Sequence, residues 1–160
     1  MANNIQLNKN GDQFVIQLTG AIDEEVNLSS DLLNGAKSFI FDFNKVESIN
    51  SCGIREWIRW LAPHNTKSII YKNCPKIIVD QINMVDGFLP NSGTVESFFV
   101  PYYSEESGEE KHVLFSYGKE YGEDGIHYPA QVVDSKNHEM ELDVIENKYF
   151  RFLQKQLKAA

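Results

Sequence analysis

The stretch Phe39–Trp60, which reads F-I-F-D-F-N-K-V-E-S-I-N-S-C-G-I-R-E-W-I-R-W, decides the fold. It opens with apolar and aromatic residues around a single aspartate, which predicts a strand buried on both faces. From Gly53 onward the apolar residues recur at three- and four-residue spacing, as on one face of a helix. Asn50 and Ser51 stand at the junction, where capping residues belong. We therefore expect a serine hydroxyl at a helix N-terminus, a place that suits negative charge.

Strand-like and helix-like segments alternate along the rest of the chain. The turn Asn10-Gly11-Asp12 joins the first two strands into a hairpin. The predicted strands are 5–7, 14–18, 38–43, 68–71, 94–103, 113–117 and 128–133, and the predicted helices are 23–34, 51–62, 75–85 and 141–158. This alternation implies an α/β fold in which helices pack on a mixed sheet, with the hairpin as its antiparallel part.

The composition is that of a globular, acidic protein. The chain has 160 residues, of which 42% are hydrophobic, and this length suits about one domain. The net charge of −8 argues against nucleic-acid binding and against a basic membrane-binding patch. No apolar run approaches the ~20 residues of a membrane span, and no secretory signal is recognisable. We expect a cytoplasmic protein in which Cys52 and Cys74 are reduced.

Two motifs resemble the STAS domain, the fold of the bacterial anti-sigma factor antagonists. The segment L-T-G-A-I-D at Leu18–Asp23 is similar to the strand end L-T-G-x-L-D of that family. The segment N-S-C-G-I at Asn50–Ile54 is similar to its D-S-S-G-L helix start, and Asp42 matches its central strand aspartate. The resemblance covers roughly Ile5–Tyr103, and it implies a STAS-like domain over residues 1–103.

The resemblance implies a non-enzymatic protein–protein interaction module in bacterial signalling. In antagonist members, a partner serine kinase, which is the anti-sigma factor, phosphorylates the first serine of the D-S-S-G turn, and this serine corresponds to Ser51. A phosphate adds about −1.5 to −2 charge, which a helix N-terminus accepts and a tight interface does not. Asn50 and Cys52 depart from the family's aspartate and second serine. An unmodified helix cap therefore remains the alternative interpretation of Ser51.

The residues predicted to contact a protein partner surround this turn. They are Asp23, Asn50, Ser51, Cys52, Gly53, Arg55 and Trp60. Gly53 is also expected to serve the structure, either by permitting a close backbone approach or by permitting the helix entry. Trp60 falls one residue off the stripe that contains Trp57, so we expect it either to be exposed beside the arginines or to cover an adjacent edge.

Two other functions remain open alongside the switch. One is an unphosphorylated structural subunit of a larger complex, stressosome-like or transporter-associated. The other is a small-ligand-binding domain, which requires a concave, apolar pocket at the loops near Ser51. No phosphate-binding glycine loop, dinucleotide fingerprint or nucleophile elbow is present, so no catalytic residue is predicted.

Residues 104–160 exceed a minimal STAS domain and resemble the zinc-ribbon-like insertion of extended bacterial STAS proteins. The segment Ser104–Gly108 has the shape of C-x-x-C-G, and Asp134–Asn137 has the shape of a second C-x-x-C. None of the four ligand positions holds a cysteine, and serine and asparagine are poor zinc ligands. We expect no metal or other cofactor here. His112, His127 and His138 could form a site together with nearby carboxylates, but scattered histidines of this kind are more often surface residues, and we expect them on the surface.

The extension is instead expected to form a hairpin over residues 104–140 followed by a helix over residues 141–158. The side chains expected to hold the hairpin are Val113, Phe115, Tyr117, Tyr128 and Val132. The apolar stripe of the helix is Leu142, Ile145, Tyr149, Phe152, Leu153 and Leu157. We expect this stripe to pack on its own domain.

Overall fold

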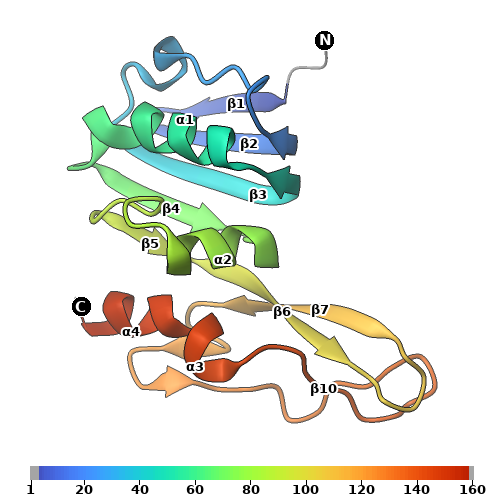
Figure 1. Ribbon diagram of the computed structural model, residues 1–160. Coiled ribbons are helices and arrows are strands. Elements are labelled where there is room, and N and C mark those ends of the chain that lie inside the picture. The colour runs from blue at the N-terminus through green and yellow to red at the C-terminus, as the bar shows by residue number, and fades with distance from the viewer. Residues whose placement is uncertain (1–3, 159–160) are drawn as a thin grey trace.

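The computed structural model describes residues 4–158, except for the side chains of residues 155, 157 and 158, and it contains two main sheets with helices beside them (Figure 1). The first sheet has five strands in the order β1-β2-β3-β4-β5. These are β1 (Ile5–Asn10), β2 (Gln13–Ile22), β3 (Ser38–Ile49), β4 (Ser68–Lys72) and β5 (Gly93–Val95). β1 is antiparallel to β2, and all other neighbours are parallel. The predicted mixed sheet of an α/β fold is confirmed.

Helices α1 (Ser51–Leu61) and α2 (Lys76–Met84) cover one face of this sheet, the front face in Figure 1. Aromatic rings fill the space between them. The Phe41 and Trp57 rings meet edge-on with their centroids 5.0 Å apart. The Trp57 Nε1 donates to the Tyr71 hydroxyl at 2.8 Å, and that hydroxyl donates to the Phe88 carbonyl oxygen at 2.6 Å. These hydrogen bonds satisfy the polar groups of the buried rings. Both ring packing and hydrogen bonds therefore hold α1 on the sheet.

The second sheet has the strand order β10-β6-β7 and is antiparallel. Its strands are β6 (Ser97–Tyr103), β7 (Glu110–Ser116) and β10 (Glu141–Leu142), and a small ribbon of β8 (Tyr121–Gly122) and β9 (Gly125–Ile126) follows β7. Helices α3 (Glu146–Tyr149) and α4 (Arg151–Lys158) end the described chain.

The C-terminal helices return to the first sheet. The Asn83 side chain on α2 donates to the Tyr149 carbonyl at 2.9 Å and accepts the Phe152 N–H at 3.0 Å. The Gln156 amide pairs with Val95 on β5, accepting its N–H at 2.8 Å and donating to its carbonyl at 3.1 Å. The edge of β5 is thus closed by a side chain from α4, which joins the two parts of the chain.

The predicted helix over residues 23–34 is wrong. β2 continues to Ile22, and only Ser30–Leu33 form a short 3-10 helix. The Asp23 and Ser29 side chains accept the N–H groups two residues later, at 3.0 and 3.3 Å respectively. Such local bonds compete with helical hydrogen bonds.

Three further predicted elements differ from the structure. The predicted strand 94–103 is divided at Glu96 between β5 and β6, because its N–H bonds to β4 and its carbonyl to the residue after β7. The predicted helix from Glu141 begins only at Glu146, since β10 first pairs with β6. No strand runs through residues 128–133.

The side chain of Leu157 lies outside the described residues. The domain division after Tyr103 stays a prediction.

Candidate functional site

The predicted site lies at the carboxyl end of the parallel strands, where β2 and β3 run on past β4. The last pair between β3 and β4 is Asp42 with Lys72, whereas β2 and β3 stay paired as far as Ile22 and Ile49. Two register shifts interrupt this extension, and Gly20 within it has a φ of 80°. Such bulges bend a strand and are frequent beside functional sites. α1 begins at the end toward which the arrows of β2 and β3 point in Figure 1.

Residues 50–53, here called the Ser51 turn, begin α1 with Asn50 as the N-cap. The Asn50 Oδ1 accepts the Gly53 N–H at 2.9 Å, and the Asn50 Nδ2 donates to the Glu24 Oε2 at 2.8 Å. Ser51 is the first helical residue and is exposed, and its hydroxyl has no hydrogen-bond partner among the described residues. The alternative interpretation of Ser51 as the cap is wrong, because Asn50 performs that role.

Glu24 is the site residue that the sequence did not single out. It is exposed, and the hydrogen bond from Asn50 lowers the pKa of its carboxyl. An aspartate at position 50 would face this carboxylate across the 2.8 Å that separates the Asn50 Nδ2 from the Glu24 Oε2, and like charges so close repel. The asparagine is therefore matched to Glu24. The available signal was Asn50 itself, an amide at the start of a predicted helix.

Gly53 lets α1 lie against the end of β2. A Cβ atom at this position would sit 2.0 Å from the Ile22 carbonyl oxygen and 2.5 Å from its carbon. No side chain fits at such distances, so the expected close backbone approach is confirmed. The contact fixes the Ser51 turn beside Ile22 and Asp23.

The remaining predicted contact residues on this surface differ in exposure. Arg55 is exposed, and its Nη2 donates to the half-buried Cys52 Sγ at 3.6 Å. Asp23 is half-buried, and its Oδ1 accepts the Glu25 N–H at 3.0 Å. The structure places these residues around the Ser51 turn, and their role in partner binding stays a prediction.

Trp60 is not exposed. It is 6% accessible, and its Nε1 donates to the Ser29 carbonyl oxygen at 2.8 Å. Its ring lies 5.9 Å from that of Phe41. Of the two expectations for Trp60, exposure beside the arginines is wrong: the segment before β3 covers the ring. We therefore leave Trp60 out of the proposed contact surface.

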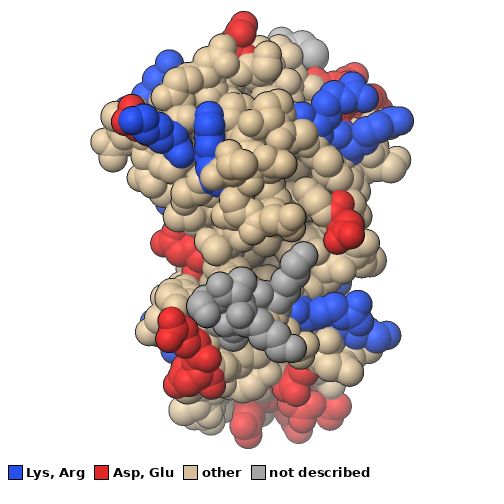
Figure 2. Space-filling model, turned by 90° about the vertical axis from the view of Figure 1, so that its left-hand side faces the viewer, with Lys and Arg blue, Asp and Glu red and all other residues tan. Residues whose placement is uncertain are grey.

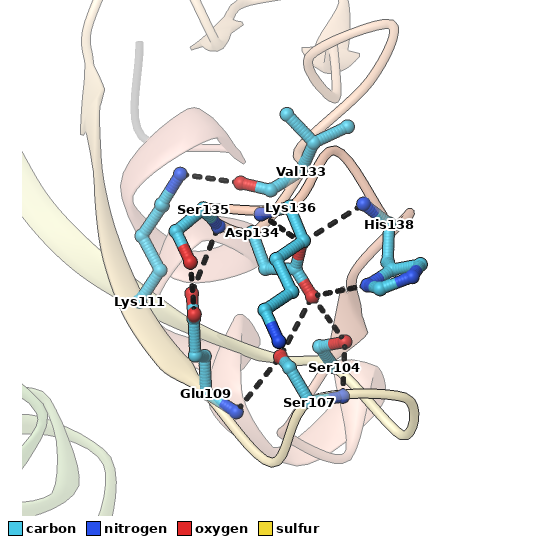
Figure 3. A network of polar contacts seen from close by, with 9 residues as sticks. All are labelled: Ser104, Ser107, Glu109, Lys111, Val133, Asp134, Ser135, Lys136 and His138. Carbon is cyan, nitrogen blue, oxygen red and sulfur yellow. Dashed lines mark hydrogen bonds and ion pairs between the residues drawn. The ribbon is translucent and has the colours of Figure 1, made fainter.

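A second polar cluster lies where β6 turns into β7, and Figure 3 shows it with its neighbours. The cluster, here called the Asp134 hub, consists of Ser104, Ser107, Asp134, Lys136 and His138. The two serine hydroxyls donate to the Asp134 Oδ2 at 2.8 and 2.6 Å. The Lys136 and His138 N–H groups donate to its Oδ1 at 2.9 and 2.8 Å. The hub joins the turn 104–109 to the turn 134–138.

The Asp134 carboxylate is completely buried yet stays ionised. Its side chain is 0% accessible. Burial alone would raise its pKa, but the hydrogen bonds from Ser107, Ser104 and the His138 and Lys136 backbones outweigh burial and hold the pKa well below its usual range. The sequence placed Asp134 in a ligand-like position without assigning it this role.

The histidines are spread over the extension. His112 and His127 are exposed, and the His127 Nε2 lies 2.9 Å from the Asp124 Oδ2. His138 is half-buried, with its Nδ1 3.1 Å from the Asp134 Oδ2. Within residues 4–158, as far as their side chains are described, no three histidine, cysteine or acidic side chains are grouped to hold a metal ion.

The apolar residues predicted to hold the hairpin are only partly buried. Phe115 and Val132 are buried, and Val113 is half-buried. Tyr117 is 49% exposed and Tyr128 is 40% exposed, yet both rings still pack. The Tyr128 ring meets that of Phe115 edge-on with centroids 6.1 Å apart, and the Tyr117 ring lies 5.7 Å from that of Tyr121. The Asp134 hub adds polar contacts at this end of the second sheet.

Three cavities lie away from the Ser51 turn. One of about 600 Å³ is beside Phe150, one of about 270 Å³ is between Leu89 and α4, and one of about 480 Å³ is beside Met84. No residue of the Ser51 turn lines any of them. They give no support to the small-ligand alternative at this turn.

Comparisons with known proteins find a partial structural likeness. No family model matches the chain, and no curated protein matches it. The solved structure titled "Structure of the Anti-Sigma Factor Antagonist SpoIIAA in its Unphosphorylated Form" is similar over 43% of this chain and 72% of that chain, with 20% identity and a TM-score of 0.33. A likeness this loose carries no functional argument, so the proposal below rests on the site.

None of the helices described combines the length and the apolar content that a membrane crossing requires.

Proposed function

We propose that this chain is a STAS-type protein–protein interaction module whose binding is switched by negative charge at Ser51. One observation carries the proposal: the Ser51 hydroxyl is exposed at the first residue of α1 and has no hydrogen-bond partner among the described residues. Because Asn50 supplies the cap, the serine is free for modification without loss of a contact in the fold.

Phosphorylation of Ser51 would change the surface more than the fold. The phosphate would add about −1.5 to −2 charge at the N-terminal end of α1, where the helix dipole favours it. It would also stand beside the exposed Glu24, which binds the cap. This surface would then carry the phosphate charge in addition to the Glu24 carboxylate. A partner that packs closely on the unmodified turn would meet repulsion and an uncompensated desolvation cost.

The kind of partner follows from the resemblance to the antagonist family. An anti-sigma factor that is also a serine kinase would both bind the Ser51 turn and modify it. The hydrogen bond from Asn50 to Glu24 supports this proposal, because it holds the Ser51 turn in place. The antagonist motif has an aspartate at the position of Asn50, so the charges around the serine differ although the turn is kept. The alternative of an unmodified structural subunit makes the opposite prediction in the same experiment.

The test is quantitative affinity capture from the native cell with wild-type protein, Ser51→Asp and Ser51→Ala, read by mass spectrometry. We expect a partner that wild type and Ser51→Ala capture and Ser51→Asp loses, together with a phosphorylated fraction of wild-type Ser51. If all three capture the same proteins equally, the switch is refuted and the structural-subunit alternative is favoured.

The matched control is Ser68→Asp. Ser68 is also exposed, and it is the first residue of β4, at the opposite end of the sheet. That end faces the viewer in Figure 2, where Lys and Arg side chains are frequent over the first sheet. Ser68→Asp adds the same charge there and is expected to capture the same partners as wild type. Loss of the partner in this control would show that total charge, and not the Ser51 turn, decides binding.

A further inference from the structure

We propose that the Asp134 carboxylate takes the place of a metal ion in this chain. It cross-links the turns 104–109 and 134–138 by accepting hydrogen bonds from both. The inference is independent of the switch at Ser51, because it concerns the opposite part of the chain.

Each of the two turns is closed by its own backbone. The Ser104 N–H donates to the Glu109 carbonyl at 2.9 Å, and the Gly108 N–H donates back to the Ser104 carbonyl at 2.8 Å. In the second turn, the Asp134 N–H donates to the His138 carbonyl at 2.9 Å, and the Asn137 N–H donates to the Asp134 carbonyl at 3.1 Å. Both turns are therefore tight, and the hydroxyls of Ser104 and Ser107 on the first reach Asp134 on the second.

Three side-chain atoms converge on one point between these turns. The Ser104 Oγ, the Ser107 Oγ and the His138 Nδ1 lie 2.8, 2.6 and 3.1 Å from the Asp134 Oδ2. Ser104 and Ser107 have the spacing of a C-x-x-C pair, and Asp134 begins the second turn.

The charges of the cluster are the reverse of those in a metal centre. A metal site surrounds a cation with acceptors, whereas here donors surround an anion. The serine oxygens accept backbone N–H groups of their own turn, from Ser107 and Glu109, both at 3.2 Å. Each serine therefore directs its own proton toward Asp134. In a metal site, the same N–H groups would bond to the thiolate ligands and orient them.

A second ring of contacts joins the turns outside the hub, as Figure 3 shows. The Glu109 carboxylate accepts the Ser135 N–H at 2.9 Å and also the Ser135 hydroxyl. The Lys111 Nζ donates to the Val133 carbonyl oxygen. These contacts fix the two turns relative to each other. In a zinc ribbon, the metal ion has this role. The buried carboxylate is thus supported from both turns and needs no cation to compensate it.

Conversion to a metal site tests the proposal directly. In the variant Ser104→Cys/Ser107→Cys/Asp134→Cys, with His138 retained as the fourth ligand, we expect stoichiometric zinc by elemental analysis. We also expect the absorption bands of a tetrahedral thiolate site after substitution with cobalt. A folded variant that binds neither metal overturns the proposal.

The matched control is Glu105→Cys/Glu106→Cys/Lys136→Cys. It places the same number of thiols on the same turns, at exposed positions whose side chains do not bond to Asp134. We expect no stoichiometric zinc in this control. Equal zinc in both variants would show that the thiols alone, and not the geometry of the hub, bind the metal.

A second measurement applies if the triple variant does not fold. In Asp134→Asn, hydrogen exchange at the His138 and Lys136 amides is expected to be at least roughly tenfold faster than in wild type, because the carboxylate that accepts them has lost its charge. Exchange at the Tyr71 amide in the first sheet is expected to be unchanged. Unchanged exchange at the His138 and Lys136 amides overturns the proposal.

Discussion

Two turns of this molecule carry serines at positions that recognisable motifs mark, and the fold treats them in opposite ways. At the Ser51 turn, Asn50 makes the capping hydrogen bond, and the Ser51 hydroxyl is exposed and without a partner among the described residues. At the Asp134 hub, Ser104 is 0% accessible, and its hydroxyl donates to a buried carboxylate.

This difference shows which serine can be modified without destabilising the fold. A hydroxyl that makes no contact in the fold can receive a phosphate, and the added charge then affects the binding of a partner. A hydroxyl in a fully hydrogen-bonded buried network cannot be modified in this way, because its hydrogen bond stabilises the buried carboxylate beside it. The following substitutions test this contrast, from the largest expected effect to the smallest.

Gly53→Ala is expected to destabilise the protein by ~3 kcal/mol, because its methyl group would enter the space of the Ile22 carbonyl, 2.0 Å away. This change would show that the Ser51 turn is anchored firmly even though its serine is free. Chemical unfolding followed by tryptophan fluorescence measures it. The control Gly122→Ala, whose new Cβ would have its nearest neighbour at 3.5 Å, is expected to cost less than ~1 kcal/mol. Equal losses in the two variants would refute the anchoring.

Ser104→Ala is expected to cost ~2 kcal/mol, because it removes a buried donor from an ionised carboxylate. Ser51→Ala, by contrast, is expected to change the free energy of unfolding by less than ~0.5 kcal/mol. The same unfolding experiment measures both. The contrast fails if the two substitutions have equal costs.

The stability of the hub is expected to depend on acid. The pKa of Asp134 is lowered in the folded protein, so its contribution is complete above the ordinary aspartate pKa of about 4 and is lost as pH falls below that value. Unfolding midpoints of wild type between pH 7 and pH 3 should therefore fall more steeply than those of Asp134→Asn. If the midpoints of the two proteins fall in parallel with pH, the ionised Asp134 carboxylate does not stabilise the folded protein.

Asn50→Asp is expected to act locally. The pKa of Glu24 is lowered by the hydrogen bond from Asn50, and an aspartate would replace that donor with a negative charge, so the Glu24 pKa should rise. Aspartate caps a helix about as well as asparagine, so the free energy of unfolding is expected to change by less than ~1 kcal/mol. A nuclear magnetic resonance titration of the Glu24 carboxyl carbon measures the shift. An unchanged Glu24 pKa would contradict the matching of the two residues.

Much of the first sheet could be predicted from the sequence. Three local patterns each indicated a single structure. They are the apolar alternation of β2 to β4, the change of apolar spacing at Gly53, and the glycine itself at a position of close backbone approach. The helix expected over residues 23–34 failed because the Asp23 and Ser29 side chains form turns of their own. Its acidic start and apolar spacing gave no sign of this competition.

The parts that the sequence missed depend on contacts between distant segments. The Asp134 hub joins residues about thirty positions apart, the division at Glu96 is set by pairing to two different sheets, and Trp60 is covered by the segment at Ser29. Serine, aspartate and histidine in turns are normally solvated, so nothing local marked them as a buried network. Spacing located the two turns, and only the tertiary structure showed what joins them.

The free energy of unfolding of Ser51→Asp, measured beside that of Ser104→Asp, tests the central claim most directly. The first substitution places a carboxylate at an exposed helix N-terminus, and it should leave stability unchanged or raise it by up to ~1 kcal/mol. The second buries a carboxylate against Asp134 and should cost ~3 kcal/mol or more. A loss of ~2 kcal/mol in Ser51→Asp would show that charge at this serine disturbs the fold, and it would contradict a switch that acts on binding alone.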